Sequence, residues 1–296
     1  MYSFLPCFCV ILCYNEGNLS GFSAVKKGRM KKMKLRDRFW IWGHPAGSLS
    51  GENSPINKSD LPPVEGTYYL GARNTFLVPM DVPVDRHHES ELAKDVANVG
   101  WSINYAWEHP EHVTEVCNLA KEFKNISRGI FDDFFSETNP KNNYTNYTPE
   151  KLAEYRKELN AAGLEFWVVL YTEEFSKIDR EVMKSFLKEF DGISLWYWNE
   201  KEVIEDYDRL LDIYLELSEG KKRMIGCYLY DFGPMAEATG EVVVRQLERE
   251  KELIKDGTIE GVILHTNAVV AKEGEPYEAV RACVQWMNEN GDEEIN

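Results

Sequence analysis

The chain has 296 residues, of which 43% are hydrophobic and 12% aromatic, and its formal net charge is −16. This length and apolar content suffice for one large domain with a substantial core, and they exclude global disorder. Because the acidic surplus repels phosphate backbones and anionic lipids, we expect neither nucleic acid nor a membrane surface as a partner, apart from a possible leader at the N-terminus.

Residues 1–35 form an N-terminal extension whose composition differs from that of the remaining chain. It opens with an apolar run (MYSFLPCFCVILCY) that is too short to span a bilayer and lacks the positive start of a typical signal peptide. Three explanations stay open, and an ordered part of the fold is the least favoured of them. A degenerate leader would send the protein to the periplasm or out of the cell. A mis-assigned start, with translation from Met30 or Met33, would leave it in the cytoplasm.

From residue 38 onward, short apolar runs rich in β-branched and aromatic residues alternate with polar loops and amphipathic stretches. Such runs predict strands, and their lack of polar positions indicates burial on both faces, as in a parallel sheet covered by helices. The eight predicted strands are residues 38–42, 74–80, 101–107, 129–131, 164–171, 192–198, 223–230 and 261–265.

The stretches between these strands show helical spacing of apolar residues. Residues 203–217 and 241–257 each carry one apolar stripe. Residues 148–163 begin with Thr148 as a predicted N-cap and end at Gly163 as a predicted C-terminal stop.

Alternation of eight strands with helices over roughly 250 residues predicts an α/β protein with a single (β/α)8 TIM barrel. We place the barrel at residues 36–290 and an acidic tail at residues 291–296. The alternative is an open doubly wound sheet. That fold usually has a glycine-rich phosphate turn after its first strand, and the sequence GHPAGS after Trp42 does not match one.

The carboxyl ends of the predicted strands carry a distinctive set of side chains, and in a (β/α)8 enzyme the chemistry takes place at these ends. Carboxylates recur at the ends of strands two to seven, with tryptophan and tyrosine beside them. Sugar rings present apolar C–H faces to aromatic planes, and their hydroxyl groups bind carboxylates. The residues that we expect to bind substrate are Trp42, His44, Asp81, Trp107, Glu108, Tyr171, Trp198 and His265.

Two adjacent aspartates, Asp132 and Asp133, follow the apolar start of the fourth strand in the stretch GIFDDFF. Side chains alternate across a strand, so deep in the barrel wall one carboxylate would face the helix layer unpaired. We therefore place the pair where the strand opens into its loop. Two close carboxyl groups repel, which raises one pKa and suits acid–base catalysis. With Asp231 after strand seven, these are the predicted catalytic residues.

Two loops are longer than usual, at residues 45–66 and 136–147, and each follows a predicted strand. Their position at the catalytic face makes them candidates for lids or binding walls. Variable surface insertions explain them equally well.

A catalytic metal is the less favoured alternative. His44, Asp81, Asp132, Asp231 and His265 could converge on a divalent ion. Metal-dependent hydrolases of the amidohydrolase type, however, carry an HxH pair on strand one and histidines on strands five and six, and this chain has only His44 on the first and none on the other two. We therefore predict no metal and no cofactor. His44 and His265 end adjacent strands and are expected to hydrogen-bond substrate or to orient a carboxylate.

The segments FWIWGHPAGS, RGIFDDFF, FWVVLYT and RMIGCYLYDFG end strands one, four, five and seven. With them, the chain from Arg36 onward resembles glycoside-hydrolase-like (β/α)8 proteins of bacterial type. The acidic pair is also similar to that of N-acetylhexosaminidases that use substrate-assisted catalysis. This resemblance implies that Asp132 and Asp133 share two roles, in either order: one orients the substrate's acetamido group and the other is the general acid.

Taken together, these features predict a carbohydrate-active hydrolase that cleaves a glycosidic bond by carboxylate acid/base catalysis at the C-terminal face of the barrel. Two alternatives remain: a sugar-binding barrel without catalysis, and a metal-dependent hydrolase or lyase. The expected partner is a carbohydrate or glycoside, and the oligomeric state stays open.

Overall fold

The computed structural model describes residues 32–49, 61–135, 144–269, 271–272 and 275–295. Within the compact unit Lys32–Asn296, eight parallel strands close into a barrel, which confirms the predicted TIM barrel. Strand β11 pairs with both β8 and β2 and thereby closes the ring. The barrel strands are β2 (Phe39–Gly43), β3 (Asn74–Leu77), β4 (Asn98–Ser102), β5 (Ile126–Phe131), β6 (Glu165–Tyr171), β7 (Gly192–Trp196), β8 (Lys222–Tyr228) and β11 (Gly261–His265).

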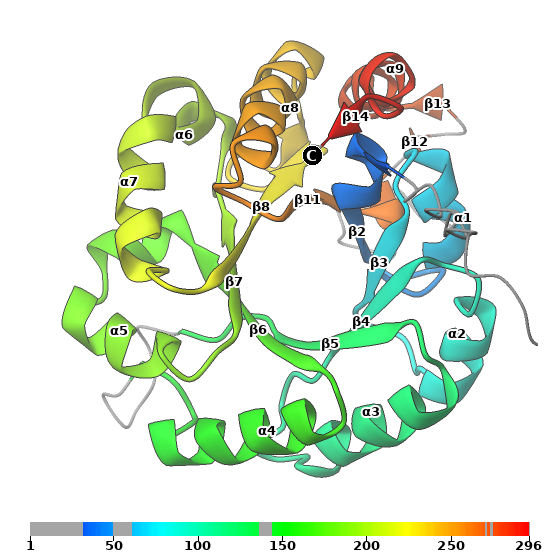
Figure 1. Ribbon diagram of the computed structural model, residues 1–296. Helices are drawn as coiled ribbons and strands as arrows, with labels where there is room; N and C mark the ends of the chain where they lie inside the picture. Colours follow the sequence, from blue (N-terminus) through cyan, green and yellow to red (C-terminus); the bar gives the residue numbers. More distant parts are fainter. Residues whose placement is uncertain (1–31, 50–60, 136–143, 270, 273–274, 296) are drawn as a thin grey trace, which may run out of the picture. The chain divides into compact units, whose positions relative to one another are not determined.

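Helices surround the barrel, so that Figure 1 shows the strands as an inner ring and the helices as an outer one. At least one helix follows every barrel strand along the described chain. The helices are α1 (Pro63–Tyr69), α2 (Arg86–Leu92), α3 (Glu111–Glu122), α4 (Pro149–Ala161), α5 (Arg180–Leu187), α6 (Glu200–Glu205), α7 (Tyr207–Leu217), α8 (Gly240–Lys255) and α9 (Glu278–Asn290).

Local signals set the helix boundaries where the side chains supply caps. The Thr148 hydroxyl accepts the N–H of Lys151 at 3.3 Å, and the chain leaves α4 through Gly163 at φ +81°, as predicted. The single helix predicted at residues 203–217 is wrong in one respect. It is two helices, α6 and α7, because the backbone of Asp206 is not helical (φ −123°, ψ 3°).

The interior of the barrel is filled by its own cluster, distinct from the larger core that lies between strands and helices. Tryptophan dominates this interior cluster, and the rings of Trp42 and Trp196 meet edge-on with centroids 5.6 Å apart. The interior cluster consists of Trp40, Trp42, Phe76, Val78, Ile130, Trp167, Val169, Trp196, Met224 and Ile263.

Glycines on neighbouring strands make room for the large rings of the interior cluster. Gly226 is the register partner of Trp196, and a Cβ atom placed on it would overlap the indole ring. Gly192 has the same relation to Trp167 on the strand before it. Since protein interiors are close-packed, each ring needs a partner without a side chain.

Arg128 closes the amino-terminal end of the barrel. Its guanidinium lies between the rings of Trp40 and Trp167, at 4.4 and 4.5 Å from their centroids. Its charge is balanced by Glu165 and Glu260, at 3.2 and 3.5 Å. The cation is therefore stacked and paired, which is the usual condition for burying a guanidinium.

The two ends of the compact unit meet at one place. Strand β1 (Met33–Lys34) pairs antiparallel with β14 (Glu294–Ile295), and Arg36 forms an ion pair with Asp292 at 3.0 Å. The described part of the acidic tail is thus held against the segment that precedes the barrel. Of the N-terminal extension predicted at residues 1–35, residues 1–31 lie outside the described residues, and residues 32–35 belong to the compact unit.

The third barrel strand, which was predicted at residues 101–107, differs most from the structure. Strand β4 spans Asn98–Ser102, and the chain then turns, with Tyr105 at φ +60°. Two features of the sequence explain why the strand was predicted too late in the chain. Asn98 and Gly100 have low strand propensity, whereas the aromatic residues of the following turn mimic a strand pattern. Trp107 and Glu108 therefore lie in a loop, beyond the end of the strand.

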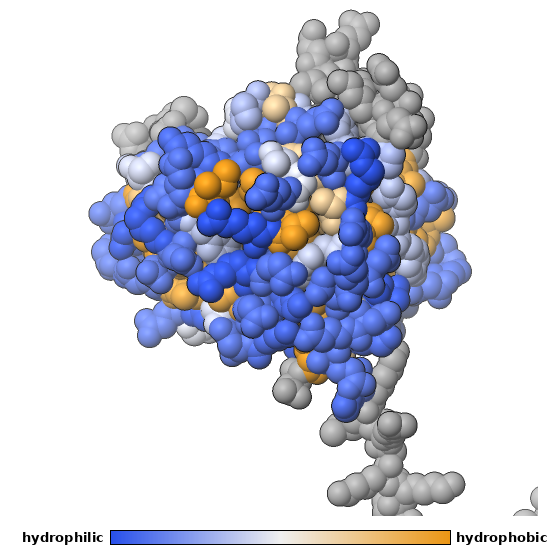
Figure 2. Space-filling view, turned by 90° about the horizontal axis from the view of Figure 1, so that it is seen from above, coloured by the Kyte–Doolittle hydropathy of each residue, from blue (hydrophilic) through white to orange (hydrophobic). Residues whose placement is uncertain are grey.

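The surface is mostly hydrophilic in the view of Figure 2, where apolar residues gather in small patches. This matches the large acidic surplus of the sequence. Among the described residues, the helices are too short or too polar to cross a bilayer.

We expect Gly226→Ala to lower the free energy of unfolding by about 1–3 kcal/mol, because the added methyl group forces the Trp196 ring out of its position. Urea denaturation measures this change. In a Trp196→Phe background the same substitution should cost clearly less, since the smaller ring leaves space. Equal costs in both backgrounds would contradict the packing argument.

Candidate active site

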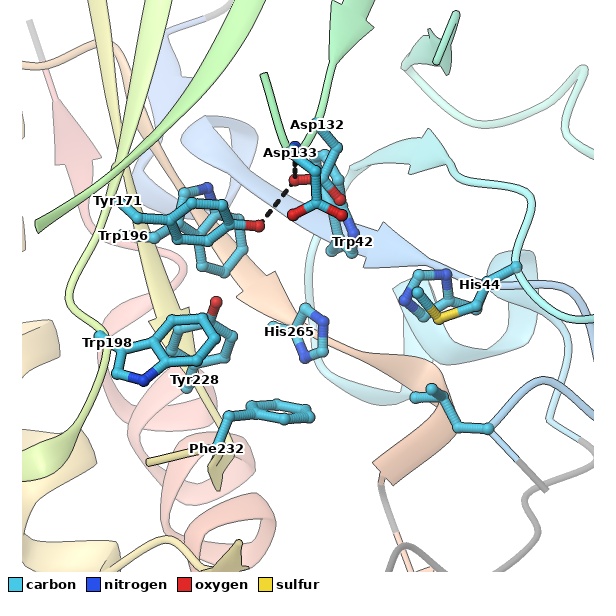
Figure 3. Close-up of a pocket in the computed structure, with 12 residues that line it drawn as sticks. Trp42, His44, Asp132, Asp133, Tyr171, Trp196, Trp198, Tyr228, Phe232 and His265 are labelled. Carbon is cyan, nitrogen blue, oxygen red and sulfur yellow. Dashed lines mark hydrogen bonds between the residues drawn. The ribbon is translucent and has the colours of Figure 1, made fainter. Parts of the chain in front are cut away.

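One pocket of about 180 Å³ opens where the strands of the barrel end, above the interior cluster. Figure 3 shows side chains from several strand ends converging on it. The residues that line it are Trp42, His44, Leu49, Met80, Asp132, Asp133, Tyr171, Trp196, Trp198, Tyr228, Phe232 and His265.

The aspartate pair lies immediately after β5, at the rim of this pocket. Phe131 ends the strand with its side chain buried in the outer core, and Phe134 and Phe135 return to that core after the pair. Between them the backbone turns at Asp133, which has φ +48°. The buried phenylalanines on either side hold the turn in place, so both carboxyl groups face the pocket.

Asp132 is half-buried, and the hydrogen bonds that its carboxyl makes with described residues all go to one oxygen. Its N–H donates to Asn104 Oδ1 at 2.7 Å. Its Oδ1 accepts the Tyr171 hydroxyl at 2.7 Å and the N–H of Asp133 at 2.9 Å. With Oδ1 occupied twice, Oδ2 is the oxygen on which a proton would reside and from which it could be donated to a ligand.

The environment favours the neutral form of Asp132. Burial, and after it the nearby carboxyl of Asp133, raise the pKa of Asp132 from 3.8 to about 7. Asp133 stands at the exposed rim of the pocket. Its carboxyl is still partly desolvated by the protein around it, and this raises the pKa of Asp133. The pKa of Tyr171 lies well above its usual value because the ring is buried beside these carboxyls, so its hydroxyl stays protonated and donates. A raised pKa of about 7 lets Asp132 keep a proton close to neutral pH.

Two neutral imidazoles form the opposite side of the pocket. The rings of His44 and His265 stand edge-on with centroids 5.7 Å apart, at the ends of the adjacent strands β2 and β11. Burial lowers the pKa of His44 to about 4, and burial followed by the neighbouring His44 holds the pKa of His265 well below its usual value. Both rings are uncharged at neutral pH.

Aromatic rings make up most of the remaining wall. Tyr228 and Phe232 lie 5.0 and 5.1 Å from the ring of His265, and Trp198 meets Tyr171 edge-on at 5.7 Å. Trp198 is positioned through its N–H, which donates to Glu202 Oε2 at 2.8 Å. The result is a pocket with aromatic sides and a polar group at each end, which is the composition typical of a small-molecule site.

The structure brings together seven of the eleven residues that were predicted for the site. Those seven are Trp42, His44, Asp132, Asp133, Tyr171, Trp198 and His265. The other four lie elsewhere. Asp81 is exposed after β3 with φ +57°, and Trp107 and Glu108 are exposed in the loop after β4.

Asp231 also lies outside the pocket. Its carboxylate accepts the N–H of Gly233 at 3.0 Å and that of Glu200 at 3.4 Å, and it lines a small neighbouring cavity. Strand β8 ends at Tyr228, so Asp231 comes three residues later than a lip position. Its placement is local, and the predicted catalytic role of Asp231 has no geometric support in the described residues.

Sequence reasoning missed five lining residues, namely Leu49, Met80, Trp196, Tyr228 and Phe232. A signal existed for two of them. Trp196 lies two residues before Trp198, so the two side chains are expected on the same face. Tyr228 follows Met224 and Gly226 at the same spacing of two, so it is expected to point into the barrel as Met224 does. Counting these alternating positions back from the true strand ends would have found both.

Parts of the predicted lid loops can be placed. Leu49, from the loop at 45–66, lines the pocket, but residues 50–60 and 136–143 lie outside the described residues. In the described part of the chain, no group of three or more histidine, cysteine or carboxylate side chains is arranged to hold a metal ion.

Neither a protein-family model nor a curated protein sequence matches this chain. Solved structures do match its fold. A protein assigned as an alpha-L-fucosidase from Bacteroides thetaiotaomicron is 10% identical with a TM-score of 0.58, over 95% of this chain and 99% of its own. A chitinase from Chromobacterium violaceum is 11% identical with a TM-score of 0.51, over 85% and 99%.

The alpha-subunit of tryptophan synthase from Pyrococcus furiosus is equally similar, at 11% identity and a TM-score of 0.51 over 86% of this chain and 97% of its own. Identities this low indicate a shared fold alone. The chain is thus a TIM barrel whose structural neighbours include glycoside-hydrolase-like proteins and an enzyme of another kind. A choice between activities has to come from the site.

We expect Asp132→Asn to raise the melting temperature at pH 8 but not at pH 3. The folded state binds an extra proton between the unfolded pKa of 3.8 and the folded pKa of about 7. Stability is therefore lost as pH rises through this window. The amide cannot ionise, so it escapes that loss. Scanning calorimetry at both pH values, with the exposed Asp212→Asn as the control, tests this; an equal gain at pH 3 and pH 8 would contradict it.

Proposed function

We propose that this protein hydrolyses glycosidic bonds, with Asp132 as the general acid. The observation that carries the proposal is the pairing of two carboxyl groups, one of them with a pKa of about 7, at the rim of an aromatic pocket. A general acid works best when its pKa is close to the working pH. The aromatic sides suit the apolar faces of a sugar ring, and the fold is one that such enzymes use.

The proposed proton transfer follows from the hydrogen bonds of Asp132. Because Oδ1 already accepts Tyr171 and the N–H of Asp133, the proton on Oδ2 passes to the glycosidic oxygen as the bond from that oxygen to the anomeric carbon breaks. The leaving sugar departs as an alcohol. Asp132 is left ionised, and Tyr171 stabilises that charge by its hydrogen bond.

The position of Asp133 favours substrate assistance over a protein nucleophile. Displacement at the anomeric carbon requires attack from the face opposite the leaving group. Asp132 and Asp133 are consecutive residues on one side of the pocket, and among the described lining residues they are the only carboxylates. We assign the attack to the carbonyl oxygen of a 2-acetamido group on the substrate. Asp133 then accepts the acetamido N–H, and water opens the cyclic intermediate.

Substitution of the two aspartates tests these roles. We expect Asp132→Asn to lower kcat by about a hundredfold to ten-thousandfold on N-acetyl-hexosaminides, the range for loss of a general acid. The loss should be smaller with nitrophenyl leaving groups, which need little protonation, than with sugar leaving groups. Asp212→Asn, on the exposed face of α7, is the matched control. Unchanged turnover in Asp132→Asn would exclude it as the acid.

The pH profile gives an independent test. Since the acid must be protonated, kcat/KM of the wild type should fall as pH rises above about 7, and this limb should vanish in Asp132→Asn.

The substrate preference tests the role of Asp133. Both anomers of the nitrophenyl N-acetyl-glucosaminides and N-acetyl-galactosaminides would be compared with the matching glucosides and galactosides. Turnover restricted to one of the N-acetyl series, and abolished in Asp133→Asn, is the expected result. Equal turnover of sugars without the acetamido group would rule out substrate assistance.

A further inference from the structure

The histidine side of the pocket contains two nitrogen atoms that the fold leaves without partners. His44 Nε2 and His265 Nδ1 are buried, and neither has a hydrogen-bond partner among the described residues. We propose that His44 Nε2 accepts a hydrogen bond from a hydroxyl group of the sugar in the pocket, so that His44 is a specificity-determining residue. This inference rests on the proposed function for the class of ligand but not for the reaction.

The hydrogen bonds of His44 identify which nitrogen can accept. Nδ1 lies 2.9 Å from the carbonyl oxygen of Val78. A carbonyl can only accept, so Nδ1 carries the ring proton and donates it. The ring is neutral because it is buried, so Nε2 has a lone pair and no proton. No donor among the described residues meets Nε2, and we assign that donor to a ligand.

The orientation of this imidazole is set by the backbone around it. The N–H of His44 donates to Asn267 Oδ1 at 2.8 Å, and Asn267 Nδ2 donates back to the His44 carbonyl at 2.7 Å. Asn267 follows β11 and so joins the ends of β11 and β2. A ring held at its backbone and at Nδ1 presents Nε2 in one direction, which is what selective recognition requires.

An unpartnered buried nitrogen is unfavourable in the empty pocket, and folded proteins rarely keep one. Here two occur on neighbouring rings, 5.7 Å apart between centroids. In Figure 3 His265 lies between His44 and the aromatic wall. Both rings line the same pocket, so one ligand can approach the two nitrogen atoms together.

The charge of the pocket narrows the ligand further. Among the described residues that line it, none is lysine or arginine, and the only ionisable acids are the two aspartates. A carboxylate, sulfate or phosphate on the ligand would find no cation in this described lining, and it could not donate to His44 Nε2. The ligand at this position is therefore an uncharged sugar with a free hydroxyl, rather than a uronic acid or a phosphorylated sugar.

Calorimetric binding of free sugars tests the inference without depending on turnover. The probes are N-acetylglucosamine, N-acetylgalactosamine, glucose and galactose, the deoxy analogues of whichever binds the wild type, and glucuronic acid. We expect one deoxy analogue to bind the wild type about tenfold more weakly than its parent sugar. His44→Phe should bind the parent about tenfold more weakly and should no longer distinguish it from that analogue. Glucuronic acid should not bind.

Two further variants keep the result interpretable. His44→Gln retains a donor for Val78 and an acceptor, so partial recovery of the discrimination is expected even if His44→Phe proves unstable. His88→Phe, an exposed histidine on α2, is the control and should match the wild type. The inference is overturned if none of the neutral sugars binds the wild type, or if wild type and His44→Phe discriminate equally between parent and analogues.

The two proposals fail separately. If His44→Phe loses the discrimination between parent and deoxy sugar but no glycoside is hydrolysed, the role of His44 in binding is supported and the proposed reaction is refuted. Hydrolysis with unaltered discrimination in His44→Phe would uphold the reaction and refute the recognition.

Discussion

The structure depends on how the barrel interior is filled. An eight-stranded barrel encloses just enough space for side chains, and here much of that space is taken by tryptophan. Rings of this size fit because the register places Gly226 beside Trp196 and Gly192 beside Trp167. Trp42 and Trp196 belong to the interior cluster and also line the pocket. The packing that fills the barrel therefore also shapes the surface on which a ligand would rest.

The two ends of the barrel treat charge in opposite ways. At the amino-terminal end Arg128 is stacked between rings and neutralised by two glutamates. At the carboxyl end the described pocket lining has no cation, and the Asp132 carboxyl accepts the Tyr171 hydroxyl and the N–H of Asp133 instead. The stacking and ion pairing of Arg128 stabilise the fold. At the carboxyl end, burial and the neighbouring Asp133 raise the pKa of Asp132 to about 7, which suits proton transfer near neutral pH.

The prediction of site residues succeeded where one short segment contains both a strand and the turn that ends it. The run GIFDDFF contains the end of β5, the aspartate pair and the phenylalanines that anchor them. It failed where the ending depends on partners far away. Trp107 and Glu108 looked like the end of a strand, but β4 pairs with its neighbours only as far as Ser102. Asp231 sits three residues beyond Tyr228 and turns to bond backbone N–H groups instead of facing the pocket.

By itself, the sequence determined the alternation of eight strands with helices and the place of the acidic pair along the chain, because hydrophobic periodicity is a local property. Closure of the barrel was a prediction that the pairing of β11 with β2 confirmed. Only the tertiary structure decided which strand-end residues share a pocket, which oxygen of Asp132 accepts hydrogen bonds, and which histidine nitrogens find no partner in the described part of the chain. Those facts depend on register and on contacts such as that between His44 and Asn267, which are 223 residues apart. No local pattern encodes a hydrogen bond across that separation.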